Sequence, residues 1–240
     1  MALHIYESAE QLTQAIGSWI YSLIAERLRS NRRFSFVLSG GNTPKSLYQL
    51  LAGQTYKDKI PWNRIDFFWG DERFVPFDDE RNNARMAYDS LLNHVPVQPN
   101  QIHPMQTNIA PEAAVKDYDS LLKGYFKSNK VEGFDLVLLG MGDDGHTLSL
   151  FPGTKVVHEN KAWVSEFYLE AQQMHRITLT KVLVNQSAFV AFMATGAGKA
   201  HALREVLEGE YHPDLYPSQV IKPASGELHW FLDKAAASGM

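Results

Sequence analysis

Apolar and polar residues follow two different periods along this chain, and together they predict alternating helices and strands. After Ser8, apolar residues recur every three or four positions as far as Leu28, which is the spacing of one helix face. The next apolar run, residues 34–38, is short and continuous, as in a buried strand. Thr43, followed by a proline, has the residue types of a helix N-cap and first position, so we expect a helix over residues 44–51.

The same alternation continues to the end of the chain. We expect further strands over residues 65–69, 134–139, 163–167, 177–179, 188–194 and 227–232, and further helices over 82–92, 111–128 and 199–207. Strands that alternate with helices predict an α/β fold, with a mostly parallel sheet covered by helices on both faces. Since no Ser- or Pro-rich linker divides the chain, we expect a single domain over residues 1–240. Two polar stretches, residues 71–83 and 211–225, are long for plain connectors and are expected to carry function.

Composition narrows the class of protein. Hydrophobic residues make up 45% of the chain and charged residues 21%, values typical of soluble globular proteins. The net charge of −4 argues against a nucleic-acid-binding surface. The absence of cysteine excludes disulfides, thiolate metal sites and cysteine nucleophiles. The first residues lack the pattern of a signal peptide, and no apolar run approaches the roughly 20 residues that span a bilayer, so we expect a cytoplasmic protein without a membrane partner.

The loop that follows the strand predicted at 134–139 combines three glycines, two carboxylates and His146. Glycines allow backbone N–H groups to approach a ligand closely, and ligands bind at the carboxyl ends of strands in open α/β sheets. Histidine changes protonation between pH 5 and 8 and can act as a general base. Taken alone, such a Gly/Asp cluster also fits a tight surface turn.

Three further loops follow predicted strands and strengthen the functional interpretation. Residues 39–44 place two glycines before a helix start, which forms a cradle for an anion, although a plain strand–helix turn fits equally well. In the second loop, Arg73 is suited to bidentate phosphate binding, and Asp71 to orienting a cation or a sugar hydroxyl. Lys199 starts the helix of the third loop and adds positive charge. Together the loops suit an oxygen-rich anion, and a sugar phosphate fits best.

The chemistry is expected to rely on His146 as a base. The chain has no cysteine and no G-x-S-x-G nucleophile elbow, so the base would act on water or on the substrate itself. Its histidines show no H-E-x-x-H motif and no pair four residues apart, so no metal site is predicted. We interpret Asp71 and Asp143 as orienting groups, hydrogen-bonded to backbone N–H groups, to Arg73 or to His146, rather than as Mg²⁺ ligands.

These segments resemble the signature of the 6-phosphogluconolactonase family, most clearly in the run Gly-Asp-Asp-Gly-His-Thr at residues 142–147. The resemblance extends in order from about residue 40 to residue 233. It is carried by residues 39–44, 70–76, 139–147, 149–153, 176–180, 196–200 and 226–233.

The resemblance implies a Rossmann-like three-layer fold, shared with glucosamine-6-phosphate isomerases. It implies hydrolysis of 6-phosphogluconolactone to 6-phosphogluconate in the pentose phosphate pathway, without a cofactor or a metal. Carried over, the presumed base would be His146, and the phosphate-binding positions would be Gly40, Gly41, Arg73, Lys199 and Arg176. From the residues themselves we add Asp71 and Asp143 to the catalytic positions, and Ser39 and Gly142 to the substrate-binding positions. Two residues depart from the family pattern: position 143 is Asp where Glu is commoner, and Leu148 stands where a small residue is usual.

Two other functions are alternatives to lactone hydrolysis. Hexosamine-6-phosphate isomerase-deaminases resemble Gly-His-Ile-Ala-Phe-Asn-Glu after the shared histidine, whereas residues 145–151 read Gly-His-Thr-Leu-Ser-Leu-Phe and lack the acidic residue. A non-catalytic sugar-phosphate sensor domain would need a DNA-binding module, yet only one helix is predicted before the first predicted strand. Oligomeric state and selectivity between phosphorylated and free lactones stay open.

Overall fold

A parallel sheet of seven strands forms the centre of the computed structural model, which describes residues 1–30 and 32–240. The strand order is β1-β10-β9-β6-β2-β3-β5, and every neighbouring pair is parallel. β2 and β3 are buried along their whole length, as expected for strands covered on both faces. The bounds are β1 Ala2–Tyr6, β2 Phe34–Leu38, β3 Ile65–Trp69, β5 Ile102–His103, β6 Leu136–Gly140, β9 Phe189–Ala194 and β10 Glu227–Asp233.

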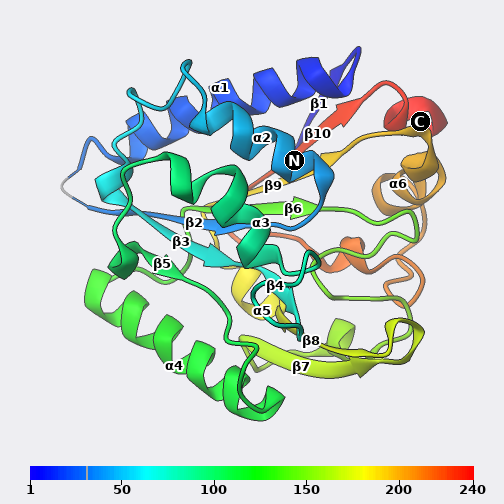
Figure 1. The fold of residues 1–240 in the computed structure, drawn as a ribbon. Helices are drawn as coiled ribbons and strands as arrows, with labels where there is room; N and C mark the ends of the chain where they lie inside the picture. Colours follow the sequence, from blue (N-terminus) through cyan, green and yellow to red (C-terminus); the bar gives the residue numbers. More distant parts are fainter. Residues whose placement is uncertain (31) are drawn as a thin grey trace.

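Helices cover both faces of this sheet, which confirms the predicted α/β fold. α1 and α2 lie together on one face, and α4 lies beyond the other (Figure 1). The periodic apolar residues of α1 are buried, and the Ser8 side chain caps the helix by accepting a hydrogen bond from the Gln11 N–H at 3.3 Å. The helices are α1 Ala9–Arg27, α2 Asn42–Ala52, α3 Asn83–Ser90, α4 Pro111–Asn129, α5 Lys181–Val184 and α6 Ala200–Leu207.

A second, antiparallel sheet packs beside α4, in the lower part of Figure 1. It consists of β4 Asp71–Arg73, β8 Met174–Leu179 and β7 Val164–Leu169, in the order β4-β8-β7. Its register places Arg73 opposite Arg176. The peptide before β4 joins the two sheets, since the Leu179 N–H donates to the Gly70 carbonyl at 2.7 Å.

Several predictions about the elements need correction. β1, β4, β5 and α5 were not predicted, and the strands expected at 163–167 and 177–179 belong to the second sheet rather than the parallel one. Because β1 precedes α1, the prediction that a helix comes before the first strand is wrong. α2 begins at Asn42 with Gly41 as its N-cap, so Thr43 does not cap it; the Thr43 hydroxyl lies 3.0 Å from that of Thr195.

The topology brings four loops to one edge of the large sheet. β2 lies between β6 and β3, and the chain continues from β2 to β3 on one side before β6 is added on the other. This reversal of direction opens a crevice at the carboxyl ends of β2 and β6, where ligands bind in open α/β sheets.

No described helix is both long enough and apolar enough to cross a membrane. The single domain stays a prediction.

Candidate active site

A pocket of about 190 Å³ lies at this crevice. Eight of the ten residues predicted for the site line it, whereas Asp143 and Lys199 do not. The lining residues are Ser39, Gly40, Gly41, Asp71, Arg73, Asn83, Gly140, Met141, Gly142, His146, Thr147, Leu148 and Arg176.

The loop after β6 presents His146 to the pocket. Gly145 adopts a positive φ of 77°, which favours glycine. A Cβ on Gly142 would lie 2.1 Å from His146 Nδ1, so this position has no room for a side chain. The Gly142 N–H donates to the His146 carbonyl at 2.8 Å, and the Thr147 hydroxyl donates to the Gly140 carbonyl at 2.8 Å. These bonds close the loop and fix the position of the imidazole.

Asp144, which was not predicted as a site residue, holds the imidazole. Its Oδ1 lies 2.6 Å from His146 Nδ1 and accepts the His146 backbone N–H at 3.1 Å. Burial raises the pKa of Asp144, but its hydrogen bonds and charge interaction with His146 outweigh this and set it below its ordinary value. With Nδ1–H donated to the carboxylate, Nε2 is the nitrogen with a free lone pair. The ring also stacks on Phe151, with centroids 4.1 Å apart.

Asp143 was predicted to orient His146, Arg73 or a backbone N–H group, and its contacts differ. Its Oδ1 lies 3.0 Å from Lys199 Nζ, and its side chain is exposed. Lys199 ends a 3₁₀ turn after β9, and the hydroxyl pair Thr43–Thr195 joins that loop to the start of α2. The ion pair of Asp143 and Lys199 therefore lies outside the pocket lining.

Asp71 contacts Arg176 rather than Arg73 or His146. Ser149 Oγ donates to Asp71 Oδ2 at 2.7 Å and accepts from Arg176 Nε at 3.0 Å. Arg176 Nη2 lies 3.5 Å from the same carboxylate oxygen, and both side chains are buried. Burial lowers the pKa of the Arg176 guanidinium, and the charge of Asp71 opposes this effect. The arginine also lies over the Phe151 ring, 5.5 Å from its centroid.

Arg73 and the N-terminus of α2 also line the pocket. Arg73 Nη1 donates to the Arg81 carbonyl at 2.8 Å, whereas its buried Nε has no hydrogen-bond partner among residues 1–30 and 32–240. Gly41 precedes α2 with a φ of 102°, and no side chain caps the helix N-terminus. A Cβ on Gly40 would lie 2.0 Å from Asn83 Oδ1. A guanidinium beside an uncapped helix N-terminus has the chemistry that suits an anion.

Glu72 is a buried carboxyl that sequence reasoning did not place at the site. It accepts hydrogen bonds from the backbone N–H groups of Arg73 at 2.9 Å and of Asn83 and Ala84 at 2.8 Å, at the N-terminus of α3. Burial raises its pKa to about 7, although these three N–H groups lower it. Asn83 lines the pocket and donates from Nδ2 to the Asp71 carbonyl at 2.9 Å. Glu72 thus holds α3 against β4.

The described residues contain no group of three or more His, Cys, Asp or Glu side chains placed to hold a metal ion. The prediction of a metal-free reaction stays a prediction.

Known proteins resemble this chain along nearly its whole length. A 6-phosphogluconolactonase of Synechocystis is 39% identical over 234 residues, which cover 96% of this chain and 93% of the relative. The crystal structure of 6-phosphogluconolactonase from Thermotoga maritima is 28% identical with a TM-score of 0.84, covering 97% of this chain and 99% of that one. The enzyme of Leishmania guyanensis is 27% identical with a TM-score of 0.88, covering 100% and 98%. Residues 7–230 match the family described as glucosamine-6-phosphate isomerases/6-phosphogluconolactonase, and the chain belongs to this family.

Proposed function

We propose that this chain hydrolyses 6-phospho-D-glucono-1,5-lactone to 6-phospho-D-gluconate in the oxidative pentose phosphate pathway, with His146 as the general base. The observation that carries the mechanism is the 2.6 Å contact between His146 Nδ1 and Asp144, in a pocket that also contains two arginines. The relatives of this chain support the activity, since they bear the name 6-phosphogluconolactonase.

The reaction needs one proton acceptor and stabilisation of one developing charge. Nε2 of His146 takes a proton from water as the water oxygen bonds to the lactone carbonyl carbon. The tetrahedral intermediate then collapses, the bond to the ring oxygen breaks, and the imidazolium returns the proton to that oxygen. A well-placed base contributes about 10²–10⁴-fold to such a step. Donors that line the pocket stabilise the oxyanion.

Binding of the phosphate, away from the reacting carbon, supplies orientation. We assign it to Arg73, Arg176 and the backbone of Ser39, Gly40 and Gly41. Lys199 would reach it from the rim of the pocket.

The remaining predicted residues act through others. Asp71 is a positioning residue for Arg176 through Ser149, because its carboxylate contacts both. Asp143 positions Lys199, and Gly142 leaves the room that the imidazole needs. No cofactor and no metal take part in this proposal, because the arginines already supply positive charge.

One structural observation favours hydrolysis over the isomerase-deaminase alternative. The acidic residue expected of those enzymes would stand at position 151, and here Phe151 stacks on His146 and lies under the Arg176 guanidinium. An aromatic ring at this place cannot exchange a proton with a sugar ring. Ring opening of an amino sugar therefore lacks its acid.

We propose the cellular setting from composition. A chain without cysteine and with a net charge of −4 suits the cytoplasm and a small-molecule substrate, without nucleic-acid or membrane partners. Fractionation of cells that express the protein tests the location. Limited proteolysis tests the single domain over residues 1–240.

The deciding experiment compares glucono-1,5-lactone with and without the 6-phosphate as substrates of the parent and of His146→Gln. We expect the parent to prefer the phosphorylated lactone and the variant to lose about 10²–10⁴-fold in kcat, with binding of 6-phosphogluconate retained. Equal rates on both lactones would refute the phosphate site. Full single-turnover hydrolysis by the variant would remove His146 from the mechanism.

A further inference from the structure

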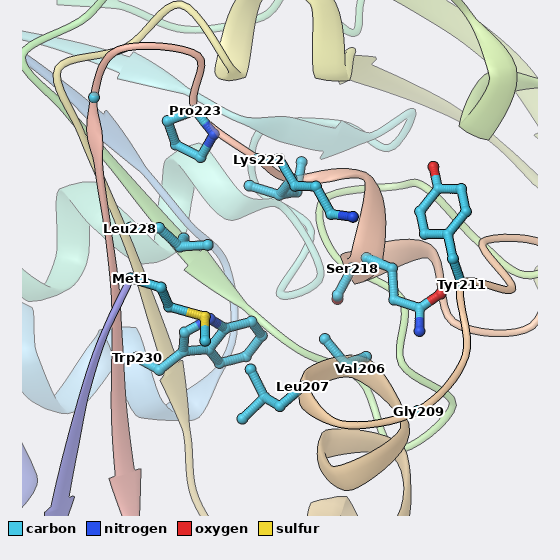
Figure 2. A pocket seen from close by; sticks show the side chains of 13 residues that line it. Met1, Val206, Leu207, Gly209, Tyr211, Ser218, Lys222, Pro223, Leu228 and Trp230 are labelled. Carbon is cyan, nitrogen blue, oxygen red and sulfur yellow. The ribbon is translucent and has the colours of Figure 1, made fainter.

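A second pocket, separate from the active site, lies between the end of α6, the chain that leads into β10, and the start of β1 (Figure 2). Its volume is about 410 Å³, within the range of small-molecule sites. It shares no lining residue with the active-site pocket. Figure 2 shows the side chains of Leu207, Leu228 and Trp230 on one side of the hollow, with Lys222 and Tyr211 on the other.

The apolar side of this pocket contains an unsatisfied hydrogen-bond donor. Trp230 is 1% exposed and stacks on Phe192, with ring centroids 3.8 Å apart. Within the described part of the chain, its Nε1 is buried without a hydrogen-bond partner. A buried N–H group without an acceptor costs free energy, about 1–3 kcal/mol. A ligand that carries an acceptor atom into this pocket would remove that cost. Met1 borders the same hollow and is 75% exposed as a residue, so its side chain has room to move aside for such a ligand.

The polar side of the pocket favours a negatively charged ligand. Lys222 is the one lining residue with a charged side chain, and it makes no ion pair with another described residue. Its Nζ lies over the Tyr211 ring, 4.5 Å from the centroid, and both side chains are exposed. Gln219, by contrast, is already occupied, since its amide donates to the carbonyls of Glu205 and Glu210. The pocket therefore offers a cation without an ion-pair partner, held over an aromatic ring, and one unsatisfied N–H donor.

The wall of this pocket is bonded to the catalytic loop. Ser218 lies in a 3₁₀ turn over Pro217–Val220, and both its N–H, at 2.9 Å, and its hydroxyl, at 2.8 Å, donate to the Gly145 carbonyl. Gly145 immediately precedes His146. A Cβ on Gly145 would lie 3.0 Å from Tyr216 Cδ1, so loop and turn are in close contact. The turn is therefore hydrogen-bonded to the residue next to the base.

From these contacts we propose that this pocket is a regulatory site for a small organic anion with an aromatic or branched apolar body. The apolar body fills the space beside Leu207 and Leu228, the anionic group pairs with Lys222, and an acceptor atom bonds to Trp230 Nε1. Occupancy acts on His146 through the bonds between Ser218 and Gly145.

The binding test uses 8-anilinonaphthalene-1-sulfonate, an aromatic anion, and N-phenyl-1-naphthylamine, its uncharged analogue. We expect Lys222→Gln to raise the Kd of the anionic probe about threefold. The Kd of the uncharged probe should stay unchanged. Lys127→Gln, an exposed lysine on α4 with the same change of net charge, is the matched control. Val206→Trp fills the hollow and should abolish binding of both probes, while its circular dichroism spectrum reports an intact fold.

A second readout locates the probe. The indole N–H signal of Trp230 in a ¹H–¹⁵N spectrum, identified by its loss in Trp230→Phe, should shift on addition of the anion. If this signal stays fixed, or if Val206→Trp binds both probes as tightly as the parent, the pocket is not the site. These measurements need no enzymatic activity, so failure of the proposed function would leave them interpretable.

The regulatory link is tested by reciprocity, and this arm rests on the proposed function. Saturation with 6-phosphogluconate should change the Kd of the anion by the same factor by which the anion changes the Kd of 6-phosphogluconate, about fivefold or more. In Val206→Trp, addition of the anion should leave the Kd of 6-phosphogluconate unchanged. Simultaneous binding without any mutual effect would refute the link between the pocket and the catalytic loop.

Discussion

Replacing Asp144 by Asn tests whether a carboxylate must hold the catalytic imidazole. Asp144 Oδ1 lies 2.6 Å from His146 Nδ1, and it is placed to stabilise the imidazolium that forms when Nε2 accepts a proton. Asparagine keeps the size of the side chain but removes its charge. Its amide can also donate to Nδ1, which would place the imidazole proton on Nε2 and block the base.

The size of the effect follows from charge and exposure. Two unit charges about 4 Å apart interact by about 1 kcal/mol in water and about 4 kcal/mol near a protein surface. Side-chain exposures of 27% for His146 and 48% for Asp144 place this pair between the two limits. We take about 2.7 kcal/mol, which corresponds to a loss of about 10²-fold in kcat. The loss cannot exceed that of removing His146 itself.

The assay is single-turnover hydrolysis of 6-phosphogluconolactone at pH 7, corrected for spontaneous hydrolysis. Asp143→Asn is the matched control, because it removes the neighbouring carboxylate, which contacts Lys199 instead. We expect Asp143→Asn to raise KM with kcat unchanged, and Asp144→Asn to lower kcat with binding of 6-phosphogluconate retained. Equal kcat values for the two variants would refute the reasoning.

Three further predictions concern binding, metals and stability. Arg73→Gln or Lys199→Gln should each weaken binding of 6-phosphogluconate by about 1.5–3 kcal/mol in calorimetry, and salt should weaken binding to the parent; unchanged affinity in the double variant would move the phosphate site elsewhere. Activity should survive exhaustive EDTA dialysis, because two arginines line the pocket; a loss restored by Mg²⁺ or Zn²⁺ would contradict this. The pKa of Glu72 is raised from 4.5 to about 7, so its stabilising contribution, full below pH 4.5, is lost as the pH rises through 7. In urea unfolding, the free energy of unfolding of Glu72→Gln should rise by about 3 kcal/mol relative to that of the parent between pH 4.5 and 7.5. Parallel plots of the two free energies against pH would refute this.

Local patterns were sufficient for most elements of the fold. The periodic face of α1, its cap at Ser8 and the apolar runs of β2 and β3 depend on neighbours in the sequence, so residue types reveal them. β1 was missed because it is an edge strand whose residues alternate between half-buried and exposed positions. β4 was missed because three charged residues become a strand only by pairing with β8, about a hundred positions later.

In the candidate site, too, some features follow from the sequence and others only from the tertiary structure. The sequence by itself determined which loops follow strands and which residues in them suit an anion and a base, because strand ends of a parallel sheet meet at one edge. Eight of the ten predicted residues accordingly line one pocket. Which side chain contacts which was decided only by the tertiary structure.

Asp143 and Asp144 are adjacent and identical in type, so no sequence pattern distinguishes their partners. The turn at Gly145 directs Asp144 to His146 and leaves Asp143 to Lys199. Likewise, Glu72 reaches the N-terminus of α3, eleven residues away, only because β4 is held in the second sheet. Hydrogen bonds act over about 3 Å, and only the folded backbone sets distances on that scale between residues far apart in the chain.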